Sequence, residues 1–98
     1  MDRQTILEYL KLQKPALERK YKMTGIGLFG SFARNEQDEE SDIDIVYSMA
    51  EGERLSYFQV IELENQLKSY LKREVELVNF KYLNPIIKYK AEKEIVYV

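Results

Sequence analysis

The segment from Ser41 to Tyr47 constrains the fold more than any other part of the chain, because its polar and apolar residues alternate. Successive side chains of a β-strand point to opposite faces of a sheet, so we predict a half-buried strand with Asp42 and Asp44 on one face. The intervening Ile43 and Ile45 should face the core. Two carboxylates held this close repel each other, and a bound cation relieves the repulsion. A polar strand edge exposed to solvent also gives an Asp-x-Asp pattern, so the pair alone leaves both interpretations open.

A shorter apolar segment, Gly25 to Phe29, predicts a buried strand that ends at Gly30. The next residues, Ser31 to Arg34, should open a helical turn. A glycine at such a junction lets the backbone approach a phosphate, and the free N–H groups of the turn then point at the anion. An ordinary turn with a helix cap also explains a Gly-Ser pair, so this feature too needs support from elsewhere.

The rest of the chain alternates helical and strand patterns. Over residues 1–22 we expect two helical pieces, the first with a capping box at Thr5 to Glu8 and the second beginning near Pro15. After a solvated loop over 35–40 and the strand described above, we expect a helix over 53–71, a strand over 74–80, a helix over 84–93 and a strand over 95–98. This order predicts an α/β fold, and the length of 98 residues predicts a single domain over 1–98.

A third carboxylate, Glu76, lies on a later expected strand between the apolar residues Val75 and Leu77. If that strand pairs beside the strand of Asp42 and Asp44, Glu76 reaches the same group of acids. A surface glutamate on a half-buried strand is the alternative interpretation. The position of Glu76 therefore depends on the pairing of the two strands.

The chain contains no histidine and no cysteine, which excludes several kinds of site. Histidine bases, Ser-His-Asp triads, disulfides and imidazole or thiolate metal sites cannot form. A metal ion would need oxygen ligands, which favour Mg²⁺ or Mn²⁺. The net charge of -2 argues against a general nucleic-acid binder. No apolar run is long enough to cross a membrane and no signal peptide is recognisable, so we expect no membrane partner and a cytoplasmic location.

Gly30-Ser31, ten further residues and Asp42-x-Asp44 together form a Gly-Ser-x10-Asp-x-Asp motif. In this motif and its flanks, 28–34 and 40–45, the chain resembles the DNA polymerase β-like nucleotidyltransferases, and in particular their minimal branch. The likeness extends to three later segments, Val75–Val78, Leu83–Pro85 and Val96–Val98. The resemblance implies the nucleotidyltransferase fold, with a small mixed β-sheet packed with helices.

The resemblance also implies a reaction, in which an acceptor attacks the α-phosphate of a nucleoside triphosphate and pyrophosphate leaves. ATP is the expected substrate, with two Mg²⁺ ions as cofactors. The catalytic and metal-ligating residues implied in this way are Asp42, Asp44 and Glu76, and the nucleotide-binding residues are Gly30, Ser31, Arg34 and Ser41. Glu76 would also accept the proton of the acceptor. For Arg34, an exposed helix arginine is the open alternative.

Two residues depart from the pattern of the family. Asn35 stands where the family usually has glycine, and asparagine tolerates the left-handed backbone conformation better than most residues. Glu76 stands where the family usually has aspartate. One added methylene moves the carboxylate by about 1 Å, and an error of that size in a catalytic site can cost roughly 10²-fold in rate. Full catalytic turnover is therefore a question that Glu76 leaves open.

The length of the chain leaves little room for an acceptor-binding domain, so we expect another protein to present the acceptor. In the family such domains are commonly antitoxin partners of HEPN-domain toxins, and some transfer AMP from ATP to a tyrosine of the toxin. The resemblance therefore implies a toxin partner. The main alternative is a catalytically weak or inactive nucleotide-binding module that neutralises its partner by contact. Transfer to a small molecule, such as an antibiotic, is a third hypothesis.

Overall fold

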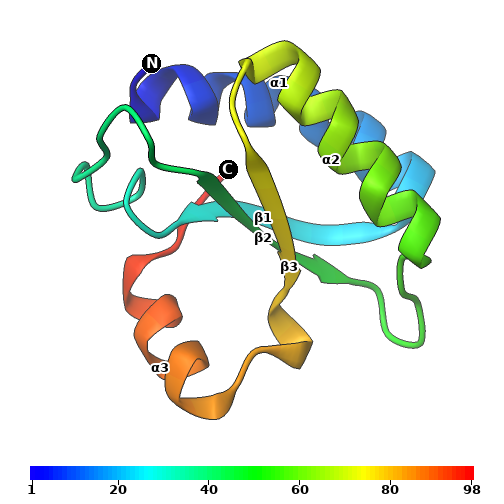
Figure 1. Ribbon diagram of the computed structural model, residues 1–98. Helices are drawn as coiled ribbons and strands as arrows, with labels where there is room; N and C mark the ends of the chain where they lie inside the picture. Colours follow the sequence, from blue (N-terminus) through cyan, green and yellow to red (C-terminus); the bar gives the residue numbers. More distant parts are fainter.

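The computed structural model describes residues 1–98 as a mixed α/β fold around one four-stranded sheet (Figure 1). In chain order the elements are α1 (Arg3–Tyr21), β1 (Met23–Phe29), β2 (Ile43–Met49), α2 (Tyr57–Leu71), β3 (Val75–Asn79), the 3₁₀ turn η1 (Phe80–Tyr82), α3 (Pro85–Glu94) and β4 (Val96–Tyr97). The α/β fold and the small mixed sheet expected from the sequence are confirmed.

The strands lie in the order β3-β2-β1-β4. β1 pairs antiparallel with both β2 and β4, whereas β2 and β3 run parallel. Helix α2 connects β2 to β3, because parallel neighbours need a crossover connection. The register of the parallel pair places Asp44 opposite Glu76 and Ile45 opposite Leu77. The strand of Glu76 therefore pairs beside the strand of Asp44, as is needed for Glu76 to reach the same group of acids.

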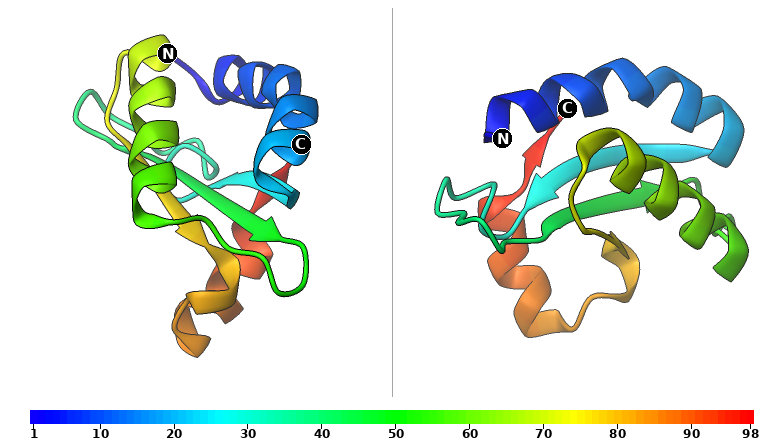
Figure 2. Two further views of the ribbon diagram at one scale, coloured as in Figure 1. Left: turned by 90° about the vertical axis from the view of Figure 1, so that its right-hand side faces the viewer. Right: turned by 45° about the horizontal axis from the view of Figure 1, so that its top comes forward.

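Two helices cover one face of the sheet and the third lies on the other side (Figures 1 and 2). The face toward α1 and α2 holds the main hydrophobic core, to which β2 contributes Ile43, Ile45 and Tyr47. Asp44 and Val46 alternate with these residues and therefore point to the opposite face, the side of α3. The acids predicted to act together thus lie outside the main core, on the less covered face.

Helix α1 differs from the expected two pieces, because it is continuous through Pro15. Proline cannot donate to the preceding turn, yet the helix continues, since Leu10, Leu17 and Tyr21 on one face are buried on both sides of that residue. The expected capping box at Thr5 is also wrong. Asp2 caps the helix, and its Oδ1 accepts hydrogen bonds from both the backbone N–H and the hydroxyl of Thr5.

Helix α2 begins at Tyr57, later than the expected start at residue 53. Ser56 and Gln59 form a reciprocal capping box that fixes this start. Residues 31–34, where a helical turn was expected, form turns but no regular helix. None of the helices is both long and apolar enough to pass through a membrane.

Candidate active site

The first feature of the site is a row of carboxylates on the α3 side of the sheet. Asp44 and Glu76 are direct neighbours on the parallel strands β2 and β3, and Asp42 immediately precedes β2. Asp44 is half-buried, whereas the other two side chains are exposed. Strand alternation and parallel pairing therefore place Asp44 and Glu76 on one face, and Asp42 is near enough for its negative charge to act on Asp44.

Gly30 lies directly against Asp44. Its φ of 76° is in the left-handed region that favours glycine, and a Cβ there would collide with Oδ2 of Asp44 and lie 3.3 Å from its Cγ. Phe29 pairs with Asp44 at the end of β1, and this pairing brings the next residue, Gly30, against Asp44. Glycine is therefore required at position 30 both by the backbone angle and by the position of the carboxylate.

The turn after Gly30 leaves several backbone donors unused. The N–H of Arg34 donates to the carbonyl of Gly30 at 3.1 Å, and the N–H of Glu36 donates to that of Ser31 at 2.8 Å. The N–H groups of residues 31–33 have no acceptor within the chain. Phe32 is completely buried and anchors the turn. Asn35 adopts a φ of 61°, so the turn forms without the glycine that the family usually has there.

The surroundings of Asp44 disfavour its charged form. Burial, together with the negative charges of Glu76 and Asp42, raises the pKa of Asp44 to about 6 from the usual 3.8, while the charge of Arg34 acts in the opposite direction. No hydrogen bond contributes to the pKa shift of this carboxyl group. A group of this kind gains from a nearby cation, because the cation offsets both the desolvation and the repulsion.

These residues fit Mg²⁺ by their chemistry, since carboxylate oxygens are the ligands that this ion prefers. The structure does not gather three or more acidic side chains closely enough to hold a metal ion. Asp42 and Glu76 are free to turn toward Asp44 because both are exposed. Metal binding by Asp42, Asp44 and Glu76 accordingly stays a prediction.

Two of the residues expected to bind nucleotide have protein partners in the structure. The guanidinium of Arg34 pairs with Glu36 at 3.1 Å and with Glu94 of α3 at 3.0 Å. The hydroxyl of Ser41 accepts a hydrogen bond from the N–H of Asp38 at 2.9 Å. Arg34 therefore links the turn to α3, and Ser41 orders the loop before β2.

Arg73 is a residue of the site that the sequence interpretation missed. Its Nε donates to the carbonyl of Ser41 at 2.7 Å, and its Nη2 donates to the carbonyl of Asp38. The guanidinium also lies 5.1 Å from the ring centroid of Phe32. Arg73 thereby joins the loop that leads to Asp42 to the turn that follows Gly30. No local pattern in the sequence predicts this role, because Arg73 is 32 residues from Ser41.

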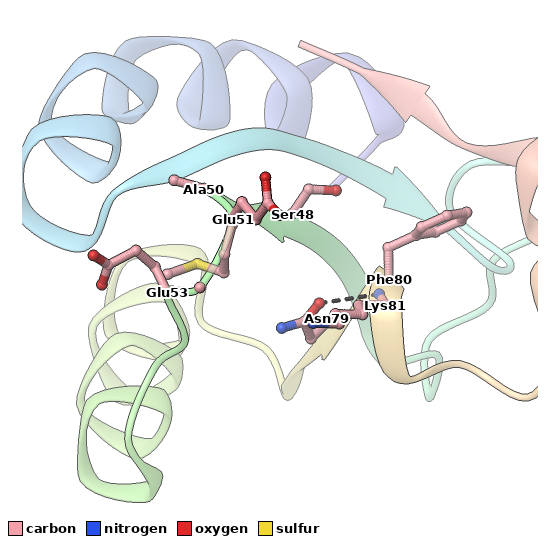
Figure 3. A pocket seen from close by; sticks show the side chains of 9 residues that line it. Ser48, Ala50, Glu51, Glu53, Asn79, Phe80 and Lys81 are labelled. Atoms are coloured by element: carbon pink, nitrogen blue, oxygen red, sulfur yellow. Dashed lines mark hydrogen bonds between the residues drawn. The ribbon is translucent and has the colours of Figure 1, made fainter.

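The surface has a pocket beside this site and another at the far end of the sheet. The near pocket, of about 330 Å³, lies between the Gly30 turn and α3, and its walls include Gly30, Arg34 and Lys90. The far pocket, of about 290 Å³, lies between the loop after β2 and the end of β3 (Figure 3). Its walls contain none of the predicted site residues and include Glu51 and Glu53. The near pocket is therefore the one that adjoins the carboxylate row.

Several relatives match the sequence of this chain along nearly their whole length. A family model described as polymerase beta, nucleotidyltransferase, matches residues 11–98. A protein from Methanocaldococcus jannaschii, provisionally named a protein adenylyltransferase, is 42% identical over 94 residues, which cover 95% of this chain and 94% of the relative. The protein adenylyltransferase MntA of Thermococcus cleftensis is 37% identical over 89 residues, which cover 91% of this chain and 88% of that protein.

Solved structures of nucleotidyltransferases and of toxin–antitoxin complexes also match this chain. A structure provisionally described as a minimal nucleotidyltransferase matches with a TM-score of 0.79 at 25% identity, over 98% of this chain and 95% of that chain. A toxin–antitoxin crystal structure with AMP-PNP matches with a TM-score of 0.72 at 26% identity, over 89% of this chain and 70% of that chain. One chain of the structure of a tri-AMPylated Shewanella oneidensis HEPN toxin in complex with MNT antitoxin shares the fold, with a TM-score of 0.66 at 22% identity over 93% of this chain and 70% of that chain. The chain thus belongs to the polymerase β nucleotidyltransferase family, as one of its minimal nucleotidyltransferases.

Proposed function

We propose that this protein transfers AMP from ATP to a tyrosine of a HEPN-type toxin, in a Mg²⁺-dependent reaction, and so acts as an antitoxin. The observation that carries the proposal is the position of Asp44, half-buried against Gly30 and in register with Glu76. The names of the relatives support the transferred group, and the toxin–antitoxin structures support the partner. No nucleic acid is part of the proposed reaction.

The unused N–H groups after Gly30 would bind the phosphates of ATP, because they have no acceptor within the chain. Glycine at position 30 would let these phosphates approach the backbone beside Asp44. Asp42, Asp44 and Glu76 would hold Mg²⁺. When bound, Mg²⁺ would supply positive charge to the attacking and leaving oxygens.

In the proposed transfer, the phenolic oxygen of the tyrosine forms a bond to the α-phosphorus of ATP. The bond from that phosphorus to the oxygen bridging to the β-phosphate breaks, and pyrophosphate leaves with the electron pair. Glu76 accepts the phenolic proton, since its exposed carboxylate stands next to Asp44 on the open face. The charged, half-buried Asp44 would hold the ion beside Gly30, where the phosphates of ATP would approach the backbone.

The test uses the purified protein, Mg²⁺, ATP and the HEPN-type partner, followed by intact mass spectrometry of the partner. We expect a mass gain that corresponds to AMP. Asp44→Asn should lower transfer by more than about 100-fold while the chain remains folded. Glu51→Gln makes a matched control, because Glu51 is an exposed acid at the far pocket. Transfer by Asp44→Asn at the unaltered rate would show that the site is assigned wrongly.

The structure also supports a second candidate, a module that neutralises its partner by contact without efficient transfer. Glu76 replaces the usual aspartate of the family, and the three acids are not gathered closely enough for a metal ion. Glu76→Asp separates the two functions. An impaired active site should gain transfer activity from this change, whereas a site adapted to glutamate should lose it. Neutralisation of the toxin without any mass gain on the toxin would favour the contact mechanism.

A further inference from the structure

The pocket between the Gly30 turn and α3 contains two cationic side chains that differ in their availability. Arg34 and Lys90 both line this pocket, which has a volume of about 330 Å³. Gly30 belongs to the same wall, so the pocket is continuous with the proposed phosphate-binding turn. A triphosphate placed at Gly30 would extend past one or both of these cations.

Arg34 is already neutralised by protein carboxylates. It pairs with Glu36 at 3.1 Å and with Glu94 at 3.0 Å, so two negative charges face one positive charge. Asp44 adds further negative charge beside Gly30. A triphosphate carries several negative charges. The Mg²⁺ of the proposed function would offset the charge of the acids around Asp44, but the terminal phosphates in the pocket would still lack an unpaired protein cation at Arg34.

Lys90 is the cation that remains. It forms no ion pair with any carboxylate of the chain, and its side chain is exposed. The other two lysines of α3 are engaged elsewhere, because Lys88 lies over the ring of Phe80 and Lys93 lies 4.2 Å from the ring centroid of Tyr89. Lys90 precedes Glu94 by four residues, so both side chains leave the helix on the face toward the pocket.

We propose that Lys90 binds the terminal phosphates of the nucleotide and so makes the site selective for the triphosphate. This inference rests on the proposed function, which supplies the nucleotide. It extends that function, because it adds a residue outside the Gly-Ser-x10-Asp-x-Asp motif. A contact of this kind acts on the β- and γ-phosphates and leaves the affinity for a nucleoside monophosphate unchanged.

The experiment measures the dissociation constants of ATP and AMP with Mg²⁺ by titration calorimetry, for the wild-type protein and two variants. Lys90→Gln should weaken ATP binding about tenfold, as expected for a lost charge-assisted contact, and leave AMP binding within about twofold. Lys93→Gln removes the same charge from the same helix away from the pocket and should bind both nucleotides as the wild type does. Lys90→Arg should retain most of the affinity for ATP, because it keeps the charge.

Two results would overturn the role of Lys90. One is unaltered ATP affinity in Lys90→Gln, and the other is equal weakening of ATP and AMP, which would indicate a contact to the nucleoside or an indirect effect. Thermal unfolding of each variant shows whether the chain is still folded. If the wild-type protein binds neither nucleotide, the proposed function itself fails. Failure of the proposed function can be told apart from failure of the role of Lys90, because the former is seen in the wild-type protein and the latter only in the variants.

Discussion

The two ends of strand β2 have similar chemical features that are arranged differently. Each end has a glycine with positive φ, Gly30 at 76° and Gly52 at 81°, together with acidic side chains and a pocket. At the Asp44 end these features meet, since Gly30 touches the carboxylate of Asp44. At the far end, a Cβ on Gly52 would have no atom within 4 Å (Figure 3 shows the neighbouring residues of the far pocket).

Both ends of β2 therefore have a glycine with positive φ, acidic side chains and a pocket, but only at the Asp44 end does the glycine contact an acid. This contact is what distinguishes the candidate site from the far end. The raised pKa of Asp44 also comes from its close surroundings, because burial and the negative charges of Glu76 and Asp42 act on this one carboxyl group. Glu51 and Glu53, the acids of the far pocket, are both exposed. Substitutions that compare the two ends should therefore have unequal effects.

The largest difference is expected between Gly30→Ala and Gly52→Ala. Both variants place a Cβ at a positive φ, which costs about 1 kcal/mol of stability. Gly30→Ala must also displace the carboxylate of Asp44, so we expect the rate of AMP transfer to fall by about 100-fold. Urea unfolding and the transfer assay give the two quantities. Equal transfer rates in the two variants would mean that the contact between Gly30 and Asp44 has no functional role.

The pH dependence of stability should come next in size. In the folded state Asp44 has a pKa of about 6, above the usual 3.8 of the unfolded chain. Between these values the folded state binds more protons, so its stability relative to the unfolded state falls as the pH rises from about 4 to 6. Asp44→Asn removes this loss. Without metal, the variant should be more stable than the wild type above pH 6, by on the order of 2 kcal/mol after allowance for solvent screening.

The measurement is urea unfolding of both proteins across that pH range in the presence of a chelator. Below about pH 4 the two proteins should have nearly equal stability, because the protonated carboxyl of Asp44 resembles the amide. A constant difference at every pH would assign the effect to something other than the titration of Asp44. Added Mg²⁺ should stabilise the wild type more than Asp44→Asn, since binding to the folded state raises its stability.

The sequence was sufficient for those features that depend on local pattern. The alternation from Ser41 to Tyr47 and the second alternating segment around Glu76 predicted the row of acids, and parallel pairing of the two strands then aligned it. Local patterns failed at Pro15, where burial on both sides of the proline outweighed the missing hydrogen bond. They also missed Ser56 as a helix cap, although the Ser-x-x-Gln signal was present.

Long-range contacts account for what the sequence did not reveal. The pairing of Arg34 with Glu94 joins residues 60 positions apart, so an arginine expected to meet phosphate is bound by a carboxylate from α3. Arg73 likewise serves a loop far from it in sequence. No spacing rule gives such contacts, because they depend on the final arrangement of the turn, the loop and α3. The number of acids near Asp44 could be predicted, whereas the exact positions of their side chains could not.

Arg73→Lys should have a smaller effect than the changes at Gly30 and Asp44. Lysine keeps the charge but cannot donate to the carbonyls of both Ser41 and Asp38 with the same geometry, so we expect a loss of about 1 kcal/mol. Because the loop leads to Asp42, the transfer rate should also fall, by several-fold. Unfolding and transfer assays on the same preparation test both effects. A loss of stability with full transfer activity would limit Arg73 to a structural role.

The smallest effect is expected at the far end, from Glu53→Gln. Glu53 pairs with Lys22 at 3.2 Å, and both side chains are largely exposed, 43% for Glu53 and 65% for Lys22. Solvent screens such a pair, so its loss should change the free energy of unfolding by no more than about 0.5 kcal/mol. The transfer rate should stay at the wild-type value, because Glu53 touches none of the residues around Asp44. A large loss of transfer from Glu53→Gln would show that the far pocket takes part in the reaction, for instance by contacting the partner. It would also contradict the distinction between the two ends of β2. A contact between glycine and carboxylate, present at Gly30 and absent at Gly52, would then no longer identify the end that functions.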